Sequence, residues 1–258
     1  MLGIGLLGYP FFSNWYNQNW QNKLVNEYNE VVDDSSDEEL QAELEACRVY
    51  NDTFMKTVVL TDPFDQTAED AFNKTYNERL NIMGNGIMGY IEIPAISVEL
   101  TIYHGTSAEV FDKGVGHMEK TSLPVGGLGT HAVLAAHTAY AKATMFNDLD
   151  ELTEGDMFYI TVLNEKLAYE VDQIKVVEPN DTSDLSIDGN EDYVTLVTCT
   201  PYGVNSHRLL VRGTRVPYVE EPEAEKPLEV LSWLLLLLPV GAVGLLSFWG
   251  IKIYKKHK

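Results

Sequence analysis

Residues 193–212 read YVTLVTCTPYGVNSHRLLVR and hold two apolar runs separated by a turn. The first run, Tyr193 to Thr198, is rich in β-branched residues and predicts a strand that ends at Cys199. Residues 200–203, Thr-Pro-Tyr-Gly, predict the turn, and Arg208 opens the second run. If the two predicted strands pair, the guanidinium of Arg208 lies near the sulfur of Cys199.

Similar short apolar runs occur upstream of this stretch, and together they predict a mainly β fold. The predicted strands are 90–93, 98–103, 132–136, 157–163, 167–177, 193–198 and 208–212. The fifth pairs with the fourth in a hairpin around Asn164, and a helix fits 141–152. Short strands with glycine and proline turns are typical of a closed or nearly closed β-barrel.

Helical periodicity dominates the first third of the chain. Apolar spacing predicts a helix over 15–32, and a weaker one over 67–81. Ser36 and Glu39 form a capping-box pattern at the start of another helix that continues to Phe54. Cys47 lies on the apolar stripe of that helix, which predicts a small core residue rather than a reactive thiol.

Charge is strongly biased toward acid. The 258 residues carry 39 acidic and 18 basic side chains, a formal net charge of −21, and the part before the basic tail carries −25. Nucleic-acid binding needs clustered lysine and arginine, so this balance argues against such a partner. No CxxC or HExxH motif occurs, and no cofactor or metal is expected.

Residues 230–251 form an uncharged stretch of 22 residues, long enough to cross a membrane as a helix. Four lysines follow it in 252–258, which predicts a cytoplasmic C-terminus. The acidic, proline-bearing stretch 218–229 before the span reads as a stalk. The body of the protein is therefore expected outside the cell, anchored in the cell membrane.

The N-terminal 22 residues contain no charge and are short for a span. They lack the basic region of a signal peptide, so they are interpreted as a truncated signal-anchor and a possible second span. The expected organisation is then 1–22 apolar segment, 23–83 helical region, 84–217 barrel, 218–229 stalk, 230–251 transmembrane helix and 252–258 basic tail.

Cys199 is the candidate nucleophile. It ends a strand beside a loop, while His137 follows the predicted strand 132–136 and Arg208 starts the neighbouring strand. A thiol, an imidazole and a guanidinium at adjacent strand ends can act as nucleophile, proton shuttle and oxyanion donor. Outside the cell, the alternative for Cys199 is a disulfide with Cys47.

Each of these residues also has an ordinary interpretation. Arg208 alone would suit a surface ion pair, and His137 competes with His104, His117, His131 and His207. The first four histidines of the chain have spacings that match no metal-binding signature.

Several motifs together resemble the class C, pilus-assembling sortases. They are Thr195-Leu-Val-Thr-Cys199 with Arg208, and further upstream the runs 103–106 (YHGT), 114–117 (GVGH) and 121–127 (TSLPVGG). The similarity covers about 84–215. It implies a sortase-type eight-stranded β-barrel with N-terminal helices, a lid loop and a C-terminal transmembrane helix, and it makes His137, Cys199 and Arg208 the catalytic residues.

The resemblance also assigns a lid. Class C sortases carry an Asp-Pro-aromatic motif upstream of the barrel, and Asp62-Pro63-Phe64 matches it. By resemblance, Asp62 pairs with Arg208 and Phe64 packs on Cys199; otherwise the motif is an ordinary turn. One departure concerns the histidine, which relatives commonly flank with Gly and Arg, whereas Ala136 and Thr138 stand here.

The implied reaction is transpeptidation. Cys199 attacks the Thr–Gly bond of an LPxTG-like sorting motif in a pilin or surface protein and forms a thioester. The acyl group then passes from the sulfur to a pilin lysine amine. With ordinary pKa values, roughly 3% of thiols and roughly a quarter of imidazoles are ionised at pH 7, so both together are rare. Either neighbours shift these pKa values, or the enzyme works through a minor form.

Other functions remain as alternatives. A housekeeping-type sortase would use peptidoglycan as its acceptor, and a non-catalytic membrane-anchored barrel would leave Cys199 unreactive. A papain-type protease places its cysteine before its histidine, whereas His137 comes first here. A sortase substrate needs an LPxTG motif just before the span, and 216–228 has none.

Overall fold

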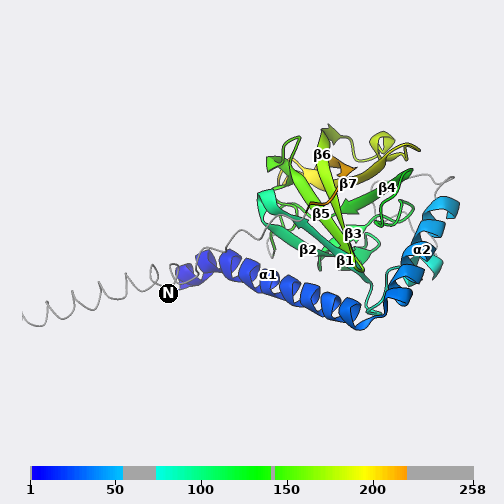
Figure 1. Cartoon of the computed structure of the whole chain (residues 1–258). Helices are drawn as coiled ribbons and strands as arrows, with labels where there is room; N and C mark the ends of the chain where they lie inside the picture. The colour runs from blue at the N-terminus through cyan, green and yellow to red at the C-terminus, as the bar shows by residue number, and fades with distance from the viewer. Residues whose placement is uncertain (1, 55–73, 141–142, 220–258) are drawn as a thin grey trace, which may run out of the picture. The chain divides into compact units, whose positions relative to one another are not determined.

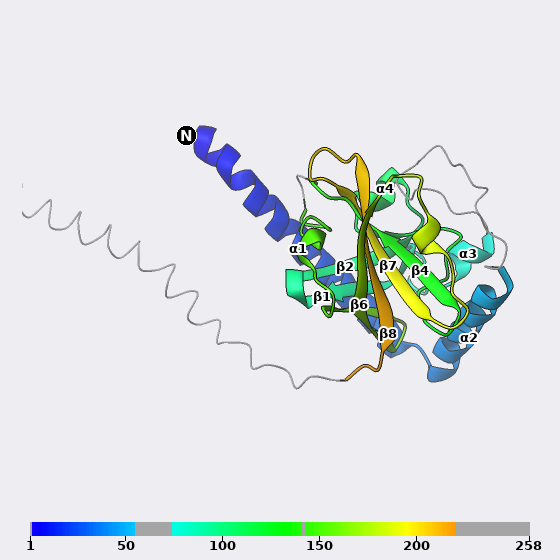
Figure 2. The same ribbon diagram turned by 90° about the horizontal axis from the view of Figure 1, so that it is seen from above.

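The computed structural model describes residues 2–54, 74–140 and 143–219, and these form one compact unit of helices and a barrel (Figures 1 and 2). Eight strands close the barrel in the order β1-β2-β3-β4-β7-β8-β6-β5. The strands are β1 Ile87–Ile93, β2 Val98–His104, β3 Val115–His117, β4 Thr130–Ala135, β5 Met157–Val162, β6 Glu165–Val177, β7 Asp192–Thr200 and β8 His207–Val216. The predicted eight-stranded barrel is confirmed.

Helices lie before and between the strands. They are α1 Leu2–Asp34, α2 Asp37–Phe54, α3 Lys74–Glu78 and α4 Ala108–Phe111, with 3-10 turns at Pro94–Ile96, Leu149–Glu151 and Ser183–Leu185. The capping box before α2 forms as predicted, because Ser36 N donates to Glu39 Oε2 and Glu39 N donates back to Ser36 Oγ. Cys47 is fully buried, as its position on the apolar stripe predicts.

Helix α1 is fixed to the barrel by two polar side chains. The Gln21 amide oxygen accepts hydrogen bonds from the backbone N–H and the hydroxyl of Thr101 in β2. The Tyr28 hydroxyl donates to Met88 O in β1 and accepts from Leu163 N. Both residues are buried, so these hydrogen bonds hold α1 in one register against the sheet.

Strands β4, β7 and β8 are buried on both faces. Along β7, Leu196 belongs to the main core inside the barrel, whereas Val197 belongs to a second cluster with Phe111 of α4 and Leu185. Adjacent residues of a strand point to opposite faces, so the second cluster covers the outer face of the sheet. This double burial explains why the predicted strands were continuous apolar runs.

Two local predictions differ from the structure. The described part of the expected helix 141–152 consists of turns with one 3-10 turn, since Phe146 N donates to His137 O instead of entering a helix. Strand β3 was not predicted, because three residues are too few to show alternation.

The predicted lid Asp62-Pro63-Phe64, the predicted span 230–251 and the basic tail lie outside the described residues. Among the helices that the structure does describe, none combines the length and apolarity needed to cross a membrane.

Candidate active site

The pairing of β7 with β8 brings Cys199 and Arg208 together. They are direct partners in the antiparallel register, as the sequence predicts for paired strands. The turn between them is closed by hydrogen bonds from Val204 N and Asn205 N to Pro201 O. Neighbouring strands lie about 4.8 Å apart, so the two side chains start from adjacent backbone positions.

His137 reaches the same place from the other side of β7. Strand β4 pairs with β7 in parallel, with Ala135 opposite Val197, and Ala136 N donates to Val197 O. Continuing this register by two residues places His137 beside Cys199. The hydroxyl of Thr198 donates to Ala136 O at 2.8 Å and fixes the β4 end there.

His137, Cys199 and Arg208 therefore form one row across three adjacent strand ends. Residues two apart share a face, so the row continues the outer cluster that contains Ala135, Val197 and Leu210. Arg208 is nearly buried, and its Nη1 donates to Asn205 O and His207 O at 3.3 and 3.1 Å. These contacts orient the guanidinium from within its own loop.

The imidazole of His137 lies between two aromatic rings. Its centroid is 5.4 Å from the stacked ring of Tyr140 and 5.2 Å from the tilted ring of Phe111. Burial lowers the pKa of His137, and the carboxylate of Asp112 partly opposes this shift. Tyr140 donates to Asp112 at 2.7 Å. The histidine is thus held largely neutral at pH 7.

Sequence analysis missed Phe111, Asp112 and Tyr140. They come from segments that carry no motif, and only the packing of α4 on the β4 end brings two of them to His137. Spacing along the chain does not show that Phe111 and Tyr140 pack against the imidazole or that the Asp112 carboxylate acts on its pKa.

The other predicted candidate histidines serve the fold. Both ring nitrogens of His104, His117 and His131 lie within hydrogen-bond distance of protein oxygens. No group of three metal-ligating side chains occurs within the described residues. Cys47 and Cys199 form no disulfide with each other.

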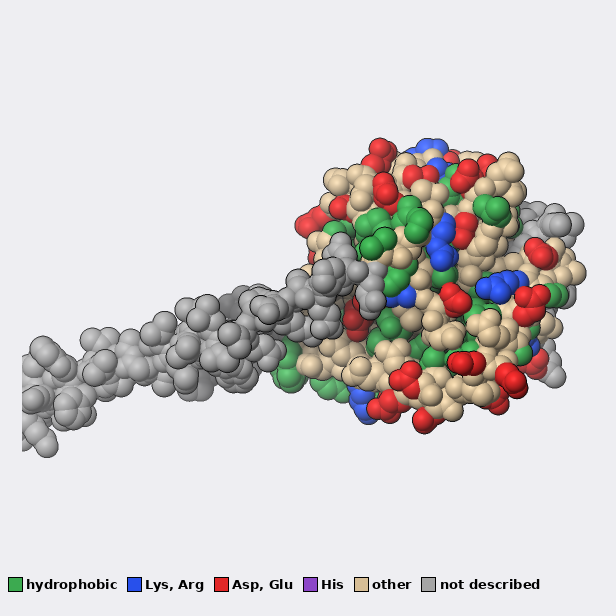
Figure 3. Space-filling model, viewed as in Figure 1, with side chains coloured by type: hydrophobic (Ala, Val, Ile, Leu, Met, Phe, Trp, Pro, Cys, Tyr) green, Lys and Arg blue, Asp and Glu red, His purple; other side chains and the backbone are tan. Residues whose placement is uncertain are grey.

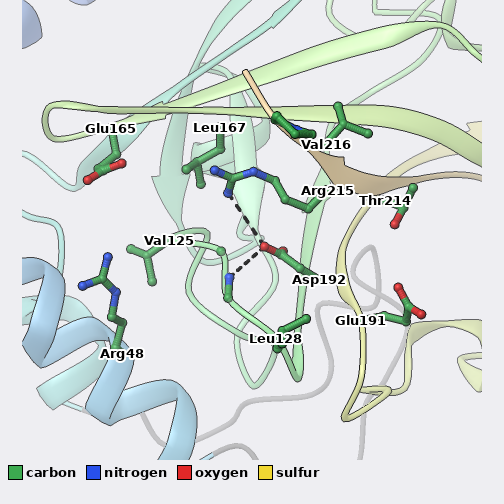
Figure 4. A pocket seen from close by; sticks show the side chains of 13 residues that line it. Arg48, Val125, Leu128, Glu165, Leu167, Glu191, Asp192, Thr214, Arg215 and Val216 are labelled. Atoms are coloured by element: carbon green, nitrogen blue, oxygen red, sulfur yellow. Dashed lines mark hydrogen bonds and ion pairs between the residues drawn. The ribbon is translucent and has the colours of Figure 1, made fainter. Parts of the chain in front are cut away.

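A cavity of about 540 Å³ lies at the other end of the barrel (Figure 4). Its wall includes Asp192 at the start of β7, Arg215 near the end of β8 and Arg48 from α2. It contains none of the predicted catalytic residues. Cys199 lines a narrower cavity of about 10 Å³.

The comparisons with known proteins agree with this geometry. The family description "Sortase domain" matches residues 91–216. Sortase C-1 of Actinomyces oris is 44% identical, with a TM-score of 0.67, and the match covers 70% of this chain and 99% of that one. The chain belongs to the sortase family.

Two further relatives are also sortases. Sortase C of Streptococcus pneumoniae is 42% identical, with a TM-score of 0.69, over 78% of this chain and all of that one. Sortase D of Bacillus subtilis is 32% identical over 131 residues, 50% of this chain and 63% of the relative. The solved relatives are class C sortases, as the motifs suggested, and sortases are cysteine transpeptidases.

Proposed function

We propose that this sortase joins pilin subunits by transpeptidation. Cys199 attacks the Thr–Gly carbonyl of an LPxTG-like sorting motif, and the amine of glycine leaves as the thioester forms. A lysine amine of a second pilin then attacks the thioester and yields an isopeptide bond. The observation that carries the proposal is the shared row of His137, Cys199 and Arg208 across β4, β7 and β8.

Each residue has a role that follows from its surroundings. Arg208 is nearly buried, so its charge acts at low dielectric on the oxyanion that forms beside Cys199. The lowered pKa of His137 makes the imidazole neutral at rest, which suits a base that first takes a proton from the thiol. The resulting imidazolium then protonates the leaving amine.

Relatives support the pilus class over wall attachment. The pneumococcal sortase C structure is described as giving insight into pilin substrate specificity. Sortase C1 of Streptococcus agalactiae is described as belonging to a pilus island. Asp62-Pro63-Phe64 in turn matches the lid motif of class C sortases in sequence, which also favours the pilus class.

Membrane attachment fits this task. Residues 230–251 would anchor the enzyme with the barrel outside the cell and 252–258 inside. Phe12, Trp15, Tyr16 and Trp20 expose between 47% and 63% of their surface on α1, the pattern of side chains at a membrane interface. An enzyme at the surface where its substrates emerge gains effective concentration. Protease added to intact cells should digest the barrel and spare the tail.

The test uses the full-length chain in detergent with an LPxTG-type peptide and two competing acceptors. One acceptor is a lysine peptide, and the other is a peptidoglycan stem peptide. We expect an isopeptide product on lysine, absent from Cys199→Ala and increased in the double variant Asp62→Ala with Phe64→Ala. A preference for the stem peptide would indicate wall attachment. A folded enzyme that cleaves no motif from a peptide library would refute the transpeptidase.

A further inference from the structure

Two aromatic rings hold the imidazole of His137, and they come from different segments of the chain. Phe111 belongs to the outer cluster at the end of α4, and its ring centroid lies 5.2 Å from that of the imidazole. Tyr140 follows His137 in the loop after β4 and stacks on the imidazole at 5.4 Å, with 24° between the ring planes. These are the distances of favourable aromatic pairs, so the two rings restrict the plane in which the imidazole lies.

The backbone between His137 and Tyr140 adopts the conformation that this stacking needs. Ala139 has a φ of 56°, in the left-handed region that residues with a side chain rarely adopt. Phe146 N donates to His137 O at 3.1 Å and closes the loop. A strained residue persists only where surrounding contacts hold it, and the stack of Tyr140 on the imidazole is one such contact.

The hydroxyl of Tyr140 connects this loop to α4. It donates to Oδ1 of Asp112 at 2.7 Å, and Asp112 directly follows the buried Phe111. The backbone N–H of Asp112 donates to Ala108 O at 3.0 Å, so the last turn of α4 fixes its main chain. One tyrosine therefore contacts the imidazole with its ring and a carboxylate with its hydroxyl.

The charges around the imidazole single out Asp112. Burial lowers the pKa of His137, and the carboxylate of Asp112 opposes this shift. Glu109 and Lys113, its charged neighbours along the chain, pair with each other at 2.6 Å, and Arg208 contributes its charge from β8 in the catalytic row. Asp112 is exposed, so water screens its charge and we expect a moderate effect.

The proposed reaction creates a positive charge on His137. When the imidazole takes the thiol proton, the S–H bond breaks, the sulfur keeps the electron pair as a thiolate, and the imidazole becomes an imidazolium. Burial disfavours the imidazolium, whereas a nearby carboxylate favours it. Asp112 keeps its own charge and takes no proton. A carboxylate held near the base therefore lowers the cost of this proton transfer.

We propose that Tyr140 and Asp112 are positioning residues of the reaction and act through His137. The tyrosine ring fixes the plane of the imidazole, and the tyrosine hydroxyl holds the carboxylate that stabilises the imidazolium. The inference rests on the proposed transpeptidase activity and adds two residues to the support of its base. Their role runs through the histidine and not through contact with the sorting motif.

The ring of His137 reports this role without any substrate. The histidines of the full-length chain in detergent are isotope-labelled, and NMR follows their signals as pH changes, with His137→Gln identifying the signal of interest. Asp112→Asn keeps an acceptor for the Tyr140 hydroxyl but removes the charge, so the titration midpoint of His137 should move to lower pH. Tyr140→Phe keeps the ring but releases the carboxylate, so the midpoint should move in the same direction by less. The double variant should match Asp112→Asn, because both changes act through one carboxylate.

Acylation provides the second readout. The rate of thioester formation with the sorting peptide should rise with pH as His137 loses its proton. In Asp112→Asn the rise should begin at lower pH and end at a plateau about threefold lower, the weight of one exposed charge pair. A purely structural effect would instead lower the rate by the same factor at every pH.

The control is Glu151→Gln, which removes an exposed carboxylate from the same connection between β4 and β5. It should leave the midpoint and the plateau unchanged, and thermal denaturation checks that every variant is folded. An unchanged His137 midpoint in both Asp112→Asn and Tyr140→Phe would overturn the inference. A wild type that forms no acyl-enzyme would overturn the proposed function instead, and the ring titration would still show whether the two residues act on His137.

Discussion

Strand β7 begins at Asp192 and ends beside Cys199, and the polar groups at its two ends meet their hydrogen bonds differently. Asp192 accepts from Gly127 N at 2.7 Å, from Tyr169 at 3.1 Å and from Thr130 at 3.4 Å, and Arg215 lies 3.7 Å away (Figure 4). At the Cys199 end, the Asn147 oxygen has no partner in the described part of the chain. The carboxylate at the start of the strand is thus fully engaged by protein groups, whereas the end of the strand carries the candidate nucleophile.

The outer surface does not mark this difference. In Figure 3, acidic side chains are spread over the face drawn, with basic ones scattered among them. Several exposed apolar side chains lie on α1, and Tyr202 and Val204 lie in the turn after Cys199. Surface charge therefore does not distinguish the two ends of β7.

The largest expected effect belongs to the thiols. Cys199→Ala should lower acyl-enzyme formation at least about a thousandfold, because no other group replaces a thiolate nucleophile. Cys47→Ala is the matched control, since Cys47 is buried in the core and makes no contact with the site. Intact-mass kinetics with the sorting peptide measures both, and equal losses in the two variants would contradict the assignment.

Arg208→Lys is expected to slow acylation by about 10²–10³-fold, because a lysine cannot reproduce the planar donors aimed at the oxyanion. Arg212→Lys changes the same strand where the side chain pairs with Asp172 at 2.8 and 3.0 Å. Single-turnover rates should fall only in the first variant. A comparable fall in Arg212→Lys would show that the effect comes from β8 stability.

His117 should make stability depend on pH. Burial lowers its pKa from 6.5 to about 4, so the unfolded chain binds this proton first as pH falls. The free energy of unfolding should then drop by up to about 3 kcal/mol between pH 6.5 and 4. Urea titrations of wild type and His117→Gln measure this drop.

In the His117→Gln variant the slope with pH should be shallower. Some slope should remain, because burial also lowers the pKa values of His104 and His131. If the free energy of unfolding of His117→Gln depended on pH as steeply as that of the wild type, His117 would not be the buried neutral imidazole inferred here. In that form its Nδ1 accepts from the Tyr76 hydroxyl at 2.8 Å.

At the completed end of β7, Asp192→Asn should cost about 2 kcal/mol of stability, because an amide group turns a donor toward groups that themselves donate. Acylation per folded molecule should not change, since Asp192 lies at the opposite end of the strand from Cys199. Denaturant unfolding and active-site titration together check this. A loss of acylation in the folded variant would show that the two ends are coupled.

The smallest effect is expected from the capping box. Ser36→Ala removes the side chain that accepts from Glu39 N and should cost about 1 kcal/mol. Thermal unfolding is the measurement, and acylation kinetics should be unaffected. A loss well above this value would mean that α2 supports the barrel more strongly than its cap suggests.

Much of the reactive end could be predicted because its residues follow strong local patterns. The β-branched run 193–198, the Pro-Tyr-Gly turn and the apolar run after Arg208 predict two strands joined by a turn, and their pairing makes Cys199 and Arg208 partners. Cys47 was placed in the core by helical periodicity alone. Spacing along the chain was enough to place a residue wherever the pattern lay within one helix or one hairpin.

Long-range contacts account for what could not be predicted. Spacing did not separate His137 from the three histidines whose ring nitrogens are both engaged, since each of those three has a partner in a distant segment. The helix expected over 141–152 was wrong because Phe146 bonds to His137 O, and tertiary contact outweighs helical propensity. Asn147 and Asp150 come to line one small cavity with Cys199 for the same reason.

The position of the acyl group on the enzyme decides whether Cys199 is the nucleophile. The full-length enzyme is incubated with a sorting-motif peptide, quenched in acid, digested and sequenced by tandem mass spectrometry. We expect a thioester on the peptide that contains Cys199, with the glycine fragment released in equal amount. An acyl group on any other residue, or cleavage of the motif in the Cys199→Ala variant, would contradict it.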